Sequence, residues 1–225
     1  MELCIDTSTR YASVGISEDG RIAAELSWRS ERNHSVELAP ALRRIMEHAG
    51  VGMEDLTAVF VALGPGGFSA LRVGLSVAKS LAMARDLPLV GVNTLDVEAA
   101  PFRGLGIPLS AVIGAGRSKV YLATYDEQIS PEGHYRVVER ERLEETSLEG
   151  TIVCGEEAGA VRDLVGARVS VSDTPPPTRS ASALAGLAYG RLRAGSTDDP
   201  DLLQPIYMHS AQFEKAKLAR GRRKK

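Results

Sequence analysis

The sequence predicts an α/β protein with two similar lobes, each containing a mixed sheet. Residues 56–93 read as a strand, a glycine turn, a helix and a second strand, which is the order of a parallel βαβ crossover. Alternating β-rich stretches precede this unit, at residues 2–28. A further strand, turn and strand begin at Pro108, after a segment rich in proline and glycine. This repetition suggests a duplicated fold.

In the first lobe, residues 2–6, 11–17 and 21–28 are expected to form an antiparallel meander with a hairpin turn at Asp19-Gly20. Apolar positions at helical spacing predict a helix over 35–49, closed by Gly50. A buried strand over 56–63, a helix over 69–84 and a strand over 87–93 complete the lobe.

The second lobe is expected to begin near residues 100–107, where Pro101, Gly104 and Gly106 cluster just before Pro108. Two strands flank a turn at 114–118, "TIVCG" reads as another strand, and "SASALAGLAYGRLRAG" predicts a helix of small residues that Gly195 ends. We therefore divide the chain into a partner-binding lobe (1–103), a second lobe (104–214) and a basic, flexible tail (215–225).

Composition narrows the function classes. The 225 residues carry a formal net charge of -2, so the chain has no overall basic field for nucleic acid and only the tail forms a basic patch. That tail reads either as a solvated end or as an arm that faces RNA. Cys4 and Cys154 are expected to be small buried residues in a reducing cytoplasm. We see neither a signal peptide nor an apolar run that could span a membrane.

The glycine turn at 64–67 does not match a phosphate-binding loop. The pair Lys79-Ser80 lies well inside the following helix, and Pro65 lacks the N–H group that a phosphate could have used. The helix itself is more informative. It carries small and apolar residues on more than one side, so it belongs either in the core or against another chain. The amphipathic helix over 35–49 could lie beside it and form a two-helix surface.

Asp6, Thr7, Ser8 and Thr9 follow the first strand and are the other candidate site. A carboxylate and three hydroxyls on such a turn can position magnesium and phosphate oxygens, but the same residue types also make ordinary turns. The four histidines include no pair at the spacing of a helical metal site, and no set of nucleophile and base can be identified from spacing. His34, next to Ser35, is expected to have a structural role where the helix begins.

The motifs "DTSTRYASVGI", "NHSVELAPAL", "GPGGFSALRVGLSVAKSLA", "LPLVGVNTL" and "QPIYM" together resemble the TsaB (YeaZ) family, strongly over residues 1–98 and more weakly to about residue 208. This family is the non-catalytic partner in tRNA threonylcarbamoyladenosine synthesis. The resemblance implies the two-lobed fold of actin and sugar kinases, and no bound cofactor. It also implies a TsaD-like catalytic subunit and a TsaE-like ATPase as partners, with tRNA reached only through the complex, and a homodimer when the chain is alone.

The resemblance also implies where the partner binds and what has been lost. The two helices look like the surface that pairs with TsaD, and the expected interface residues are Leu38, Leu42, Ile45, Met46, Leu71, Gly74, Leu75, Ala78 and Ala82. The catalytic branch follows "GVN" with a His-x-x-x-His metal pair, whereas this chain has Thr94 and Glu98 at those two positions, and neither Asp96 nor Glu98 restores such a site. We therefore expect no metal and no catalysis, with Asp6 to Thr9 as a vestigial nucleotide site.

Two other functions remain open at this stage. A small ATP-dependent phosphotransferase or ATPase of the same fold would use Asp6 and the three hydroxyls that follow it. A metallopeptidase is disfavoured by the missing histidine pair.

Overall fold

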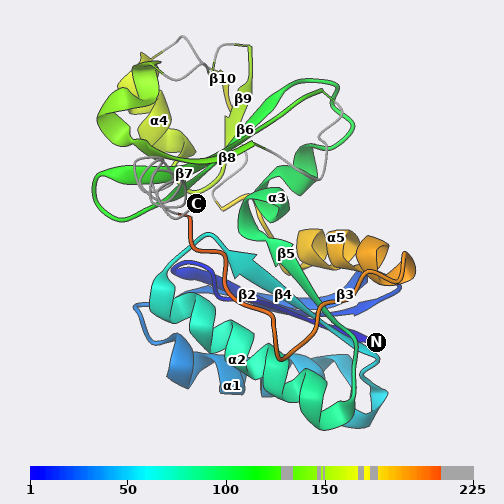
Figure 1. Cartoon of the computed structure of the whole chain (residues 1–225). Helices are drawn as coiled ribbons and strands as arrows, with labels where there is room; N and C mark the ends of the chain where they lie inside the picture. Colours follow the sequence, from blue (N-terminus) through cyan, green and yellow to red (C-terminus); the bar gives the residue numbers. More distant parts are fainter. Residues whose placement is uncertain (128–133, 146–147, 149, 167–169, 173–176, 209–225) are drawn as a thin grey trace, which may run out of the picture.

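The structure is a computed structural model of the whole chain, and it describes residues 1–127, 134–145, 148, 150–166, 170–172 and 177–208. Two five-stranded sheets lie one above the other, joined through the helix α3 (Figure 1). None of the helices in the described ranges combines the length and the apolar character needed to cross a bilayer.

The first sheet has the strand order β3-β2-β1-β4-β5. β1, β2 and β3 are the predicted antiparallel meander, whereas β4 and β5 run parallel to β1. β1 and β4 are buried along their whole length, which explains why their sequences are nearly continuous apolar runs. The bounds are Glu2–Asp6, Tyr11–Glu18, Arg21–Arg29, Ala58–Gly64 and Leu89–Asn93.

The second sheet repeats this topology, with the order β10-β9-β6-β7-β8. β6, β7 and β8 form an antiparallel meander, and β9 and β10 lie parallel to β6. The duplicated pattern expected from the sequence is therefore present in the strand order of both sheets. The bounds are Leu109–Gly114, Lys119–Tyr125, His134–Glu139, Ile152–Cys154 and Ser170–Val171.

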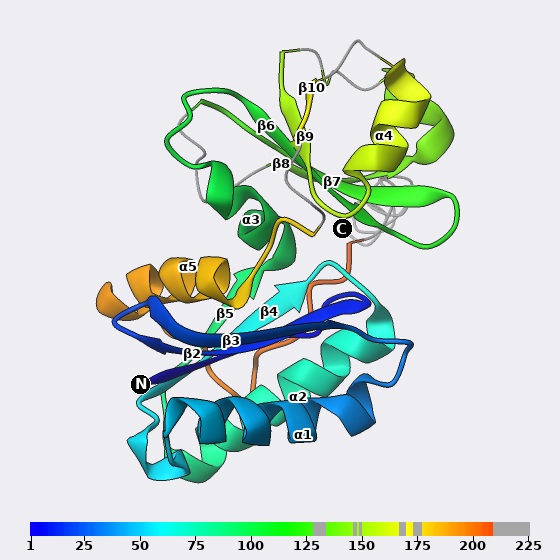
Figure 2. The same ribbon diagram turned by 180° about the vertical axis from the view of Figure 1, so that it is seen from behind.

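Helices cover both faces of the first sheet. α1 (His34–Ala49) and α2 (Phe68–Arg85) lie side by side on one face, and α5 (Ala181–Arg193) covers the other (Figures 1 and 2). On the second sheet, α3 (Thr94–Ala99) packs on β6 and β7, and α4 (Ala158–Val165) packs on β9 and β10. Short 3₁₀ helices occupy Met53–Asp55, Ala100–Phe102 and Arg140–Glu145.

In each lobe, the helix that follows the last strand packs against the sheet of the other lobe. α3 follows β5 of the first sheet but packs within the second-lobe core, whereas α5 comes after β10 and packs on the first sheet with Cys4, Phe60 and Val90. The sequence predicts the segment of α5 as part of the second lobe. Its small residues instead allow it to lie close over the first sheet, where Ala181 meets Gly15. The boundary at residues 103 and 104 stays a proposal.

The predicted elements of the first lobe are confirmed, and most of their ends differ from the prediction by one or two residues. Four short elements were not expected from the sequence: α3, α4, β8 and β10. His34 is buried and its Nε2 lies 2.8 Å from the carbonyl oxygen of Thr9, so its structural role is confirmed. Cys4 and Cys154 are buried free thiols. The basic tail, 215–225, lies outside the described residues.

Candidate functional site

A single arginine joins three carboxylates where the two lobes meet. Arg179 precedes α5 and its side chain is almost completely buried. Its Nε lies 2.8 Å from Asp6 Oδ2, its Nη1 2.6 Å from Glu98 Oε1, and its Nη2 2.7 Å from Glu156 Oε1. Asp6 ends β1, Glu98 lies on α3, and Glu156 precedes α4. One guanidinium therefore connects the first sheet, the helix between the lobes and the second lobe.

The surrounding groups complete this cluster. Glu98 Oε2 accepts hydrogen bonds from the backbone N–H of Thr178 at 2.7 Å and of Arg179 at 2.9 Å. Arg179 Nη2 also donates to the carbonyl oxygen of Tyr11 at 2.9 Å. Burial raises the pKa of Glu98, and the positive charge of Arg179 opposes this shift. Burial lowers the pKa of Arg179, but the nearby carboxylates raise it by more, so the guanidinium stays charged.

The four residues expected to form a vestigial nucleotide site all bond within the chain. Asp6 accepts from Arg179 and from the backbone N–H of Ser8, at 2.8 Å each. The Thr7 hydroxyl donates to the carbonyl oxygen of Ala70 at 2.7 Å and accepts from the N–H of Gly74 at 3.1 Å. Thr7 therefore bonds within the first lobe, and Asp6 also takes part in the ion cluster at the lobe junction.

The other two hydroxyls are engaged across longer stretches of sequence. Ser8 Oγ lies 2.8 Å from Thr94 Oγ1, on α3. The Thr9 hydroxyl donates to Glu156 and accepts from Arg179 Nη2 at 2.5 Å. The sequence placed these residues at the end of the first strand, but it gave no sign that Arg179 would take up their bonding capacity.

Thr94 and Glu98 lie one turn apart on α3 and both are fully buried. Thr94 accepts from the N–H of Gly64 at 2.9 Å, and Glu98 holds Arg179. Across the described part of the chain, no group of three or more histidine, cysteine, aspartate or glutamate side chains could hold a metal ion. The expected absence of a metal stays a prediction.

The two-helix surface differs from the expectation. Seven of the nine residues that we expected at a partner interface are buried inside this chain's own core, so they cannot be contact residues. They lie on the sides of α1 and α2 that face the first sheet, because that sheet needs an apolar cover. The prediction was wrong for these seven: Leu38, Ile45, Leu71, Gly74, Leu75, Ala78 and Ala82.

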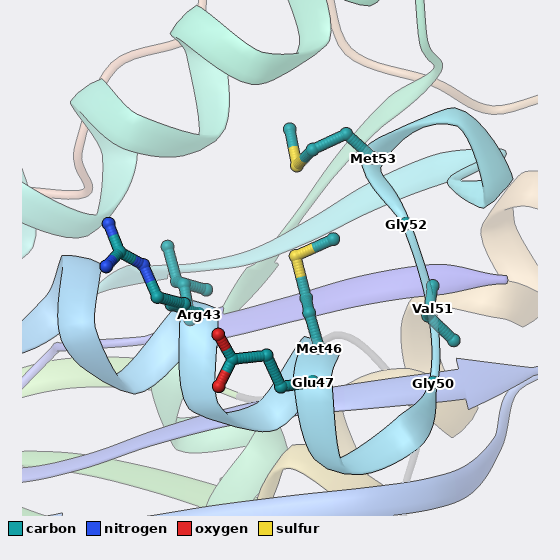
Figure 3. Close-up of a pocket in the computed structure, with 8 residues that line it drawn as sticks. Arg43, Met46, Glu47, Gly50, Val51, Gly52 and Met53 are labelled. Atoms are coloured by element: carbon teal, nitrogen blue, oxygen red, sulfur yellow. The ribbon is translucent and has the colours of Figure 1, made fainter.

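Leu42 and Met46 are the two that remain accessible, and both line an open pocket. This pocket has a volume of about 560 Å³ and lies between the second half of α1 and the loop that follows it. The side chains of Met46 and Met53 stand over the hollow, while Arg43 and Glu47 lie on the helix beside it (Figure 3). The remaining lining residues are Gly50, Val51 and Gly52. We call this set of eight residues the α1 pocket.

The chain after α5 covers part of α2. Lys79 Nζ donates to the carbonyl oxygen of Leu203 at 3.2 Å, and Ile206 joins the core beneath. At the first turn of α2, the rings of Phe68 and Tyr207 stack with centroids 5.3 Å apart. This covering segment, residues 203–207, was not expected from the sequence, because it has no regular secondary structure. The covering is partial, because Phe68 and Met83 on α2 remain exposed.

Comparison with known protein families matches residues 28–145 to the family model for TsaD, described as tRNA N6-adenosine threonylcarbamoyltransferase. The chain is 31% identical to the TsaB protein of Bacillus subtilis (strain 168) and 34% identical to that of Escherichia coli (strain K12), both described as tRNA threonylcarbamoyladenosine biosynthesis proteins. These matches cover 58% and 55% of this chain, and 59% and 54% of the relatives. The matched part is thus little more than half the length of those relatives.

Solved structures extend the likeness over most of the chain. A Pseudomonas aeruginosa protein described as similar to peptidase YEAZ superposes with a TM-score of 0.78 at 25% identity, covering 92% of this chain and 99% of its own. The ethanolamine utilization protein EutJ of Carboxydothermus hydrogenoformans has the same fold at 13% identity, with a TM-score of 0.52 over 82% of this chain and 88% of its own. The predicted two-lobed, actin-like α/β fold is confirmed.

Proposed function

Because the chain belongs to the TsaB (YeaZ) family of TsaD-related proteins, we propose that it is a non-catalytic subunit in tRNA threonylcarbamoyladenosine biosynthesis. In this proposal it binds and supports a TsaD-like subunit. That partner transfers a threonylcarbamoyl group to the adenosine next to the anticodon. The chemistry belongs to the partner, and this chain supplies a surface.

The observation that carries the proposal is the α1 pocket. Its lining is mostly apolar and includes two methionines, so a partner side chain that fills the hollow would remove apolar surface from water. Methionine side chains adapt their shape to whatever apolar group enters. Arg43 and Glu47 at its side can fix the orientation of a partner helix through charge. We therefore place the partner's contact on α1 and the loop after it.

The ion cluster at the lobe junction supports the non-catalytic part of the proposal. In a two-lobed enzyme of this fold, polar groups between the lobes would need to be available to a substrate. Here Asp6, Thr9 and Glu98 all bond to Arg179, and Thr7 bonds within the first lobe. A nucleotide or metal at this point would have to displace a buried guanidinium, which is costly because three carboxylates hold it.

Further partners follow from family membership. We propose that a TsaE-like ATPase joins the complex and that tRNA reaches the catalytic subunit there. When alone, the chain is proposed to form a homodimer that covers the same α1 face, because an exposed apolar surface tends to pair. A cytoplasmic location fits a protein that modifies tRNA.

The partner test needs substitutions that do not damage the fold. Charged residues at Leu75 or Ala78 would unfold the protein, since both side chains are buried in its core. Met46→Arg and Met53→Arg instead place a charge in the α1 pocket. We expect each to weaken binding to the TsaD-like subunit of the same organism by at least about 30-fold, since a charge in an interface centre costs roughly 2 kcal/mol or more.

Leu164→Arg is the matched control. Leu164 is an apolar side chain on α4 that is 42% exposed, far from the α1 pocket in the fold. Titration calorimetry should give unchanged partner affinity for this variant. Wild-type affinity in both methionine variants would contradict the proposed surface. Threonylcarbamoyl transfer to tRNA by the isolated chain would contradict the non-catalytic role.

A further inference from the structure

The turn between β9 and α4 carries two adjacent glutamates that bond to different lobes. Gly155 begins this turn with a φ of 99°, and a Cβ there would lie 2.5 Å from the carbonyl oxygen of Val112, so the position requires glycine. Glu157 pairs within the second lobe, where its Oε2 lies 2.9 Å from Arg140 Nη1. Glu156 instead bonds across the lobe junction.

Glu156 contacts two groups that belong to the first lobe or are held against it. Its Oε1 lies 2.7 Å from Arg179 Nη2, and it accepts a hydrogen bond from the Thr9 hydroxyl. Thr9 lies between β1 and β2, and its hydroxyl also accepts from the backbone N–H of Tyr11 at 3.1 Å. The side chain of Glu156 is only 7% exposed, so solvent ions screen these contacts weakly. We call Thr9, Glu156 and Arg179 the lobe latch.

The charge balance at the junction shows that Arg179 does not need Glu156 to stay paired. Asp6 and Glu98 contact the same guanidinium at 2.8 and 2.6 Å, so two carboxylates already face its single positive charge. Loss of Glu156 therefore leaves no buried cation without a partner, whereas loss of Arg179 would leave three carboxylates without one. The contribution of Glu156 is an attraction between the lobes that the fold of either lobe does not require.

We propose that the lobe latch holds the two lobes together, and that its release lets the β9 side of the second lobe move away from the first lobe. Hydrogen bonds to a charged group are about twice as strong as neutral ones, and Glu156 makes two of them across the junction. Two alternative lobe positions that differ by these bonds form an equilibrium that a single side chain controls.

Each lobe has an apolar core of its own, so the angle between the lobes can change without unfolding either one. Leu3 and Leu38 belong to a cluster in the first lobe, and Val112 and Val161 to another in the second. α3 and α5 lie between the two sheets (Figure 2). This inference goes beyond the proposed function, because it concerns motion within one chain and does not depend on whether the α1 pocket binds a partner.

The experiment measures the distance between the lobes by pulsed electron paramagnetic resonance on the full chain. Two spin labels are attached through the substitutions Arg44→Cys on α1 and Leu164→Cys on α4, two exposed positions in different lobes. Cys4 and Cys154 are buried free thiols, so they stay unlabelled.

Three variants are compared in this labelled background. Glu156→Ala removes the latch, and Glu156→Gln removes its charge but keeps an oxygen acceptor. Glu157→Ala is the matched control, because it removes the neighbouring carboxylate and breaks an ion pair within the second lobe only. Circular dichroism checks that each variant is folded.

We expect one distance with the latch intact and in Glu157→Ala, and a second, longer distance in Glu156→Ala. Loss of two charge-assisted bonds should raise the population at the longer distance by at least about tenfold. Glu156→Gln should populate it to an intermediate extent, and this variant decides the question if Glu156→Ala does not fold. The proposal is overturned if the folded Glu156 variants keep the wild-type distance, or if Glu157→Ala gains the longer one to the same extent.

Discussion

Replacing Arg179 with methionine tests how far the ion cluster holds the fold together. Arg179→Met keeps the length of the side chain but removes the guanidinium that contacts Asp6, Glu98 and Glu156 within 2.6 to 2.8 Å. Removing one partner of a buried ion pair costs roughly 3–5 kcal/mol, because the other charge is left uncompensated in the interior. Here three carboxylates lose their cation at once, so we take this range as the expected minimum.

The free energy of unfolding is measured by urea titration, together with the midpoint of thermal unfolding. For a chain of this size, each kcal/mol lowers the midpoint by about 2–4 °C, so the variant should melt about 6–20 °C below wild type. Arg179→Lys keeps a positive charge but not the planar fork of donors, and we expect an intermediate loss. Arg44→Met removes an exposed arginine from α1 and should change stability by less than about 0.5 kcal/mol.

The deficit of Arg179→Met should also depend on pH. Burial without a cation disfavours the charged form of a carboxylate and so raises its pKa. Protonation at lower pH removes this cost. The difference in unfolding free energy between wild type and variant is therefore expected to shrink between pH 7 and pH 5. Wild-type stability in the methionine variant, or a deficit that grows as the pH falls, would refute the reasoning.

Two further predictions concern the two buried thiols and the packing around two helical glycines. Burial raises the pKa of Cys4 to about 12 and also raises the pKa of Cys154, so neither thiol is a thiolate at pH 8; a colorimetric thiol reagent should label neither in the native protein and both in denaturant. A Cβ at Gly74 would overlap the Thr7 hydroxyl, so Gly74→Ala should lower the unfolding free energy by about 1–3 kcal/mol. Gly186→Ala, on a helix position with open space around it, should instead raise it by up to about 1 kcal/mol, and equal effects from the two alanine substitutions would disprove the packing argument.

Local patterns were enough to predict most of the first lobe. The meander, the crossover β4-α2-β5 and the ends of α1 follow from apolar periodicity, from Asp19-Gly20 and from Gly50, whose φ of 65° a side chain rarely adopts. The resemblance to a family added the two-lobed fold. Short elements such as α4 were missed, because eight residues are fewer than the window of about 11–18 residues over which a helical period is judged.

The sequence by itself determined which residues are apolar enough to fold each unit and placed Asp6 to Thr9 at the end of a strand. Tertiary structure alone decided that α5 covers the first sheet and that Arg179 reaches Asp6, 173 positions earlier in the chain. It also decided that seven expected interface residues face inward, leaving Leu42 and Met46 accessible. The physical reason is that an amphipathic pattern shows which side of a helix avoids water, but only the packed neighbours show whether that side meets its own sheet or another protein.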